Sequence, residues 1–161
     1  MKRIPKSELQ TKEHYAISIP AREKIMALQE AISQSPECLT EKELEDQLNT
    51  HYFAPGVYGR EMLIPAGTVI VGKIHKHAHL NVITQGVIKV VTEFEEVVYE
   101  GPRTWISQPG IKRAVYALED TVWLTVHANP TDTQDIREIE DAVIAPDFET
   151  LDKLMITSGE V

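Results

Sequence analysis

The sequence has few of the residues that form disulfides or that hold a chain in a membrane. Its 161 residues include a single cysteine, Cys38. One thiol forms no intramolecular disulfide and supplies no thiolate cluster for zinc. No stretch of 18 apolar residues occurs, and the basic N-terminal residues lead into polar ones instead of an apolar run. We therefore expect a soluble, unexported protein of the cytoplasm with no membrane partner.

Basic residues and nucleotide motifs are also scarce. Sixteen Lys and Arg stand against 25 Asp and Glu, which gives a net charge of −9 and opposes binding to nucleic-acid phosphates. The glycine-rich phosphate loops are absent, so we expect no nucleotide cofactor. The sequence has no Gly-x-Ser-x-Gly, and Cys38 lies far from the histidine-rich segment, which leaves nucleophilic catalysis without support.

The first part of the chain, residues 1–50, reads as an arm followed by two short helices. Residues 1–18 show no period, whereas apolar residues recur at helical spacing from Pro20 until Ser35 and Pro36. Thr40 and Glu43 have the spacing of a capping box, which predicts the start of a second helix. Both helices are amphipathic and need a surface to cover.

From residue 51 to about 130 the period becomes alternating and β-branched residues become dense. About eight short strands without an intervening helix predict an all-β core, an antiparallel sandwich or barrel. The remaining residues, 131–161, are acidic and then amphipathic after Pro146, which predicts a C-terminal helix. The predicted strands are 57–64, 68–75, 79–84, 87–93, 96–100, 103–107, 112–117 and 121–127.

Three of the six histidines, His75, His77 and His79, occupy alternate positions in one predicted strand region. Neutral imidazole is the commonest protein ligand for transition metals, and a strand points residues i and i+2 to one face. The spacing therefore predicts a metal site. The alternative is the polar, solvent-facing stripe of a half-exposed strand.

This pattern resembles the cupin family. The resemblance rests on Pro65-Ala66-Gly67-Thr68, the histidine cluster, Gly86 at the start of the next strand and Gln108-Pro109-Gly110 before a later one. It covers residues 51–130 and implies an antiparallel jelly-roll β-barrel that holds a divalent transition metal, Zn, Fe, Mn or Ni. His79 stands seven residues before Gly86, where the family has a glutamate. His75 and His77 then stand for the family's His-x-His pair.

Strand geometry ranks these three histidines. A straight strand would separate His75 from His79 by roughly 13 Å, too far to share one ion. The chain must therefore bend near His77 if the imidazoles are to converge. Because His77 could then point outwards, we rank His75 and His79 above it.

The second cupin motif ends in a histidine, and Arg113 occupies that position here. A guanidinium has no lone pair for a metal, but it binds carboxylates and phosphates, so we expect Arg113 to hold a small anionic ligand or to pair with Glu61. His127, on a predicted strand face with Thr121, Trp123 and Thr125, is a substitute ligand; its alternative is a surface or hydrogen-bonding residue.

The functional expectation is a small metalloenzyme or a metal-dependent binder of small molecules, with Glu61 or Tyr116 as a group that moves a proton. Tyr116 could equally be ordinary strand packing, and Glu61 a solvated charge. The alternative function is a non-enzymatic structural or assembly module, for example in a phage particle. The segment from His51 to Glu61 resembles cupin-like proteins of tailed phages and bacteria. Amphipathic extensions outside a closed core favour a homo-oligomer or a protein partner, and the alternative role is to cap their own barrel.

Overall fold

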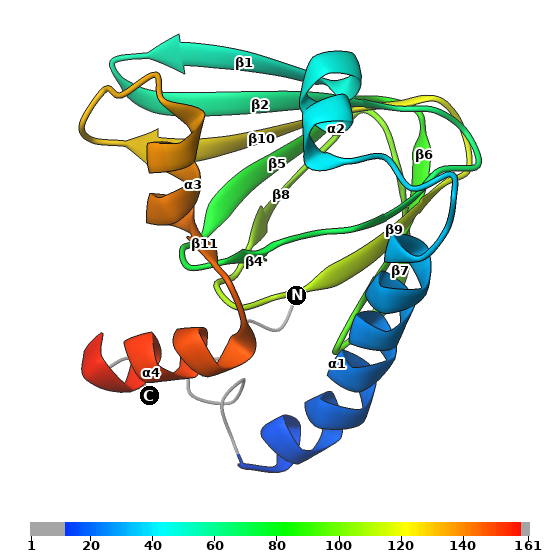
Figure 1. Cartoon of the computed structure of the whole chain (residues 1–161), viewed down its shortest axis with the longest axis vertical. Coiled ribbons are helices and arrows are strands. Elements are labelled where there is room, and N and C mark those ends of the chain that lie inside the picture. Colours follow the sequence, from blue (N-terminus) through cyan, green and yellow to red (C-terminus); the bar gives the residue numbers. More distant parts are fainter. Residues whose placement is uncertain (1–11, 159–161) are drawn as a thin grey trace.

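The computed structural model describes residues 12–158, and Figure 1 shows two facing β-sheets flanked by helices. The chain begins with α1 (Lys12–Ser33), which starts before the predicted Pro20. The predicted capping box is confirmed at α2 (Glu41–Leu48), where Thr40 Oγ1 accepts from the Glu43 amide at 3.3 Å and the Glu43 carboxylate accepts from the Thr40 amide at 2.8 Å. Residues 1–11 of the predicted arm lie outside the described residues.

Two antiparallel sheets form the body of the protein. The five-stranded sheet has the order β1-β2-β10-β5-β8, and the four-stranded sheet has the order β3-β9-β6-β7. A third, two-stranded ladder joins β4 to β11. The strand bounds are β1 (Asn49–Ala54), β2 (Gly56–Ile64), β3 (Val69–Val71), β4 (Ile74–His75), β5 (His79–Gln85), β6 (Val87–Thr92), β7 (Glu96–Glu100), β8 (Arg103–Ser107), β9 (Arg113–Ala117), β10 (Thr121–Asn129) and β11 (Ile144–Ala145).

The strand order identifies a jelly roll. Setting aside β1 and the short β4 and β11, eight strands remain, and in chain order the first pairs with the eighth, the eighth with the third and the third with the sixth. The second, seventh, fourth and fifth make the other sheet, which completes the double Greek key of a jelly roll. The predicted fold class is thus confirmed. Within residues 12–158 no ladder closes the two larger sheets into one continuous barrel.

The core fills the space between the two sheets. The five-stranded sheet contributes Ile64, Ile83 and Trp123, and the four-stranded sheet contributes Ile88 and Val115, all of them buried. Each such side chain stabilises the fold by about 1.5–3 kcal/mol relative to an exposed one. This cluster also makes the apolar floor of a cavity between the sheets.

Helix α1 is tied to the sandwich at one buried ion pair. Arg22 Nε lies 2.9 Å from Glu93 Oε1 in the turn between β6 and β7, and the Arg22 guanidinium lies 4.1 Å from the Phe148 ring centroid. Ile25, one turn further along, is buried. The helix therefore covers its own sandwich, one of the two roles open to an amphipathic extension.

The C-terminal segment adds more structure than the sequence predicts. The predicted helix is confirmed as α4 (Phe148–Ser158), which buries Leu151. The acidic stretch before it forms α3 (Ile136–Val143), which the sequence analysis missed, and Ile139 packs there against Tyr58. β11 follows and pairs with β4, so this segment supports the histidine region (Figure 1). None of the helices in residues 12–158 is both long enough and apolar enough to span a bilayer.

Candidate metal centre

The chain bends between β4 and β5, as the histidine spacing requires. β4 ends at His75, residues 76–78 leave the strand conformation, and β5 begins at His79. The bend brings the ring centroids of His75 and His79 to 4.0 Å from each other instead of the roughly 13 Å of a straight strand. Backbone bonds hold its first half, because Lys76 N donates to Val143 O and Gly110 N donates to His75 O, each at 2.8 Å.

His127 completes a group of three imidazoles. It lies near the end of β10, next to β5 in the same sheet, on the strand face that also buries Thr121, Trp123 and Thr125. Its ring centroid lies 5.0 Å from that of His75 and 4.8 Å from that of His79. One nitrogen from each histidine can be chosen so that all three lie within 4.8 Å of one another, and all three residues are buried.

The hydrogen bonding leaves acceptor nitrogens without partners. His79 Nδ1 lies 3.3 Å from the His77 carbonyl oxygen, which can only accept, so Nδ1 carries the proton and Nε2 keeps its lone pair. His79 Nε2 is buried and has no hydrogen-bond partner, and the same holds for His75 Nδ1. Buried polar atoms without a partner are costly, and a metal ion would satisfy both.

The environment keeps the three imidazoles neutral. Burial lowers the pKa of His79 to about 4, with the cations Arg113 and Arg60 acting in the same direction. Burial lowers the pKa of His127 to about 3, with smaller effects from His79 and Arg60. Burial likewise depresses the pKa of His75 strongly, helped by the other two histidines. Neutral imidazole is the form that binds a metal ion.

The three residues fit a transition-metal ion. Ligands of an ion bound at about 2.1 Å lie about 3–3.5 Å apart, so nitrogens that are up to 4.8 Å apart need to approach one another by at most about 1.3–1.8 Å. Three nitrogen ligands leave coordination positions for water or a small molecule, as in catalytic rather than closed structural sites. A neutral set of imidazoles suits Zn, Fe, Ni or Cu better than Ca or Mg.

The other predicted site residues lie elsewhere. His77 is exposed and outside the group of three. Glu61 is half-buried on β2, where it accepts a bond from Tyr52 Oη at 3.3 Å, and it is not among the residues that line the cavity. Tyr116 is 42% exposed on β9, next to the cavity-lining Val115 and therefore on the opposite strand face.

Arg113 is buried beside the histidines. Its Nη2 donates to Ser107 Oγ at 2.6 Å, and its Nη1 donates to Asn81 Oδ1 at 3.4 Å. Asn81 Oδ1 also accepts from Trp123 Nε1 at 3.1 Å, and Asn81 Nδ2 donates to Ser107 Oγ at 2.8 Å. Burial lowers the pKa of Arg113 to about 10, so the guanidinium stays charged at neutral pH. The expected pairing with Glu61 does not occur, because the guanidinium bonds to the neutral side chains of Ser107 and Asn81 instead.

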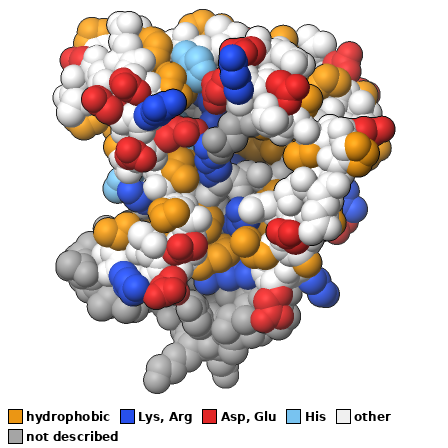
Figure 2. All heavy atoms as spheres, in the orientation of Figure 1, with side chains coloured by type: hydrophobic (Ala, Val, Ile, Leu, Met, Phe, Trp, Pro, Cys, Tyr) orange, Lys and Arg blue, Asp and Glu red, His pale blue; other side chains and the backbone are white. Residues whose placement is uncertain are grey.

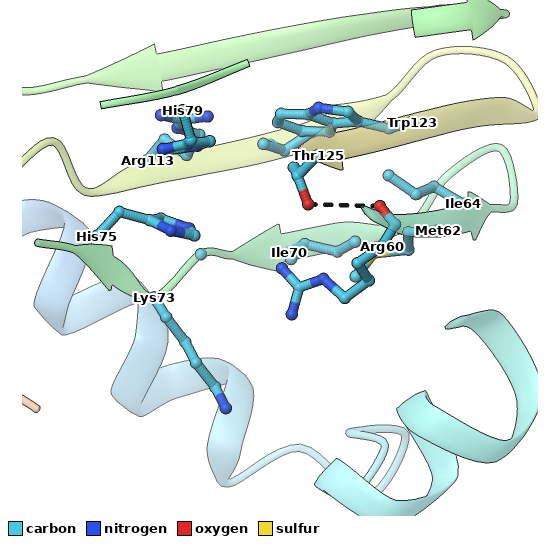
Figure 3. Close-up of a pocket in the computed structure, with 12 residues that line it drawn as sticks. Arg60, Met62, Ile64, Ile70, Lys73, His75, His79, Arg113, Trp123 and Thr125 are labelled. Atoms are coloured by element: carbon cyan, nitrogen blue, oxygen red, sulfur yellow. Dashed lines mark hydrogen bonds between the residues drawn. The ribbon is translucent and has the colours of Figure 1, made fainter. Parts of the chain in front are cut away.

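A cavity of about 80 Å³ opens beside His75, His79 and Arg113 (Figure 3). Sequence reasoning missed two of its charged residues, Arg60 and Lys73. Strand alternation contained the signal for Arg60, because Tyr58 and Ile64 are buried on β2 and Arg60 shares their face, whereas Glu61 does not. Lys73 lies in the irregular segment between β3 and β4, where no period applies.

Comparison with known proteins finds similarity only to solved structures. No family model matches the sequence, and no curated protein matches it. Solved structures similar to this chain include cupin domains. A cupin-2 conserved barrel protein from Salinispora arenicola is 12% identical, with a TM-score of 0.47, over 58% of this chain and 88% of the other.

Two further similar structures come from other bacteria. KdgF from a Halomonas species is 16% identical, with a TM-score of 0.44, over 50% of this chain and 77% of the other. An acetylacetone dioxygenase from Acinetobacter johnsonii is 14% identical, with a TM-score of 0.43, over 50% of this chain and 58% of the other. The predicted likeness to phage-encoded proteins stays a prediction.

Proposed function

We propose that this cupin-type jelly roll binds one divalent transition-metal ion through His75, His79 and His127 and presents it to a small molecule in the adjoining cavity. The observation that carries the proposal is the convergence of three buried, neutral imidazoles, two of which have a ring nitrogen without a partner. His127 takes the role of last ligand that Arg113 cannot fill. Of the four ions predicted from the sequence, Zn, Fe and Ni suit three imidazole ligands better than Mn does.

A bound ion would act as a Lewis acid toward a ligand oxygen or lower the pKa of a bound water. The residues around the ion would hold its ligands in place and orient them. The carbonyl of His77 fixes the His79 tautomer, the β4–β11 ladder fixes the backbone of His75, and Arg113 supplies a fixed positive charge beside the site. No carboxylate lines the cavity among the described residues, so an enzymatic reaction here relies on the ion or on the substrate itself for proton transfer.

Metal stoichiometry tests this proposal. The full chain is stripped with chelator, desalted, reconstituted with Zn²⁺, Fe²⁺, Mn²⁺ or Ni²⁺ in turn, and its metal content is measured by plasma mass spectrometry after gel filtration. We expect one equivalent of the preferred ion in the wild type and in His77→Ala, which is the matched control. His75→Ala, His79→Ala and His127→Ala should each retain less than a tenth of that. Equal metal content in all five proteins would refute the site.

A second candidate role, self-association, is favoured by the outer edge of the five-stranded sheet. β1 is an edge strand, and Tyr52 and Phe53 on it are exposed, as is Val57 at the start of β2. Exposed apolar edge strands are sites of pairing between chains. We propose that a second copy of the chain pairs there. Light scattering after gel filtration should show a dimer for the wild type and a monomer for Tyr52→Lys, and a monomeric wild type would exclude the pairing.

A further inference from the structure

The charged side chains that line the cavity beside the histidines are all positive among the described residues. Arg60, Lys73 and Arg113 line it together with His75 and His79, and no aspartate or glutamate does so among the described residues. This is unusual for a chain whose net charge is −9. Figure 2 shows Lys and Arg side chains gathered in the hollow of the face seen in Figure 1. A concave site that concentrates positive charge attracts anions.

Arg113 has the environment of a binding group rather than of a structural ion pair. Its residue is 8% exposed, and within residues 12–158 it forms no ion pair. Its hydrogen bonds to Ser107 and Asn81 hold the guanidinium plane but do not neutralise it. Glu93 acts on it electrostatically, but that carboxylate is bonded to Arg22. A buried cation without a counter-ion is costly, and an anionic ligand would remove that cost.

Arg60 supplies a second guanidinium on the other side of the cavity. Its backbone carbonyl accepts from Thr125 Oγ1 at 3.3 Å, which fixes the strand from which the side chain enters the cavity (Figure 3). No carboxylate in residues 12–158 forms an ion pair with it. Lys73, by contrast, is neutralised by Glu140 at 2.8 Å. The two arginines are therefore the cavity's unneutralised charges, and guanidinium is the group that binds carboxylate in a bidentate manner.

Most of the remaining wall is apolar. Met62, Ile70 and Trp123 also line the cavity, and they are continuous with the core. Inorganic phosphate would leave this surface uncovered, whereas a small organic acid would cover it with its carbon atoms. The volume of about 80 Å³ is well below the roughly 150 Å³ of a cavity that binds benzene, so the ligand has few heavy atoms.

We infer that the cavity binds a small organic carboxylate, with its carboxylate on Arg60 and Arg113 and its carbon body against Met62, Ile70 and Trp123. This deepens the proposed function, because it names the class of molecule that would meet the metal ion. The inference rests on the proposed function only for the contact between the carboxylate and the metal ion, because both arginines line the cavity whether or not an ion is bound. The arginine that replaces the expected metal ligand is thus a ligand-binding residue.

The two tryptophans of the chain provide a direct readout. Trp123 Nε1 donates to Asn81 Oδ1, which also accepts from Arg113, so a carboxylate that engages Arg113 alters the surroundings of that indole. Trp105 lies outside the cavity-lining set but packs against Trp123, with ring centroids 5.6 Å apart, so its indole signal should shift less than that of Trp123. The experiment is a ¹⁵N–¹H correlation titration of the metal-free, desalted full chain with propanoate. Matched titrations use propanamide, which has the same shape without the charge, and inorganic phosphate.

We expect propanoate to shift the Trp123 indole signal saturably, and propanamide and phosphate to bind at least tenfold more weakly. Arg60→Gln should weaken propanoate binding at least tenfold, because it removes one charge-assisted partner. Arg103→Gln, the same substitution at an exposed arginine of β8, should leave it unchanged. Arg113→Gln should behave like Arg60→Gln, and Arg60→Gln carries the test if the buried variant does not fold.

Three results would overturn the inference: equal affinity for propanoate and propanamide, equal affinity for phosphate, or unchanged propanoate binding in Arg60→Gln. The proposed metal site is tested separately by metal content. A chain that takes up one equivalent of metal but does not bind propanoate would retain the proposed function and lose this inference. A chain that binds propanoate through Arg60 but takes up no metal would retain this inference and lose the proposed function.

Discussion

Acidification should destabilise the metal-free protein through the three buried histidines. In the folded chain, burial holds the pKa of His79 at about 4 and that of His127 at about 3, and it depresses the pKa of His75 strongly. The unfolded chain has ordinary histidines with a pKa of about 6.5. As the pH falls below that value, the unfolded state binds protons first, and the free energy of unfolding decreases until the pH reaches the folded pKa values.

The size of the effect follows from the same pKa values. At pH 5, a histidine with an unfolded pKa of about 6.5 that stays neutral in the fold costs about 2 kcal/mol. Three such residues cost about 6 kcal/mol between pH 7.5 and pH 5 if they act independently. Since domains of this kind are stable by only about 5–15 kcal/mol, the loss is a large fraction of the whole.

Urea unfolding, followed by tryptophan fluorescence at pH 7.5 and pH 5.0 without metal, measures this loss. His127→Gln should reduce the difference between the two pH values by about 2 kcal/mol relative to the wild type, because it removes one of the three protonation costs. His77→Gln is the matched control and should change the difference by less than about 0.5 kcal/mol, because its side chain is exposed. If His127→Gln leaves the pH dependence as it is in the wild type, the histidine group is not buried and neutral.

Three further predictions follow from single contacts. Gly86 has φ +93°, and a Cβ there would clash with the backbone oxygen of Asp120, so Gly86→Ala should lower the free energy of unfolding by at least about 2 kcal/mol in a urea titration; a loss under about 0.5 kcal/mol would contradict this. Arg22→Met leaves the fully buried Glu93 carboxylate unpaired and should cost about 3–5 kcal/mol, with Glu93→Gln restoring part of that in the double variant; an undestabilised single variant would show that the pair does not hold α1. Zn²⁺ at about 100 times its dissociation constant should stabilise the wild type by about 2.7 kcal/mol in a thermal melt and should leave His127→Ala unchanged; equal stabilisation of both would place the ion elsewhere.

Periodicity and turn residues were enough to predict most of the fold. The alternation of apolar residues and the breaks at glycine and proline predicted the eight jelly-roll strands closely, although residues 68–75 form two short strands, β3 and β4. Gly86 has the positive φ that its place between two strands requires. β1, β11 and α3 were missed. β1 is an exposed edge strand without alternating apolar residues, and a strand of two residues such as β11 shows no period. In α3, the apolar residues Ile139 and Val143 stand among acidic and polar residues that obscure the helical period.

The sequence predicted the parts of the site that depend on which face of a strand a residue occupies. It did not predict the parts that depend on which strands pair with each other. The face shared by Thr121, Trp123, Thr125 and His127 followed from alternation, and the required bend near His77 followed from distance alone. The neighbours of Arg113 did not, because Asn81 and Ser107 reach it from other strands, and only the sheet order brings them together. Glu61 was predicted to move a proton because it is a carboxylate, but it lies on the strand face that turns away from the cavity.

Anomalous diffraction from crystals of the reconstituted protein tests the metal centre most directly. With data collected on both sides of the absorption edge of the bound ion, we predict one anomalous peak about 2.0–2.2 Å from a ring nitrogen of each of His75, His79 and His127. The peak should be absent from crystals of His79→Ala. A fully loaded crystal whose only peak lies away from these three imidazoles would contradict the account.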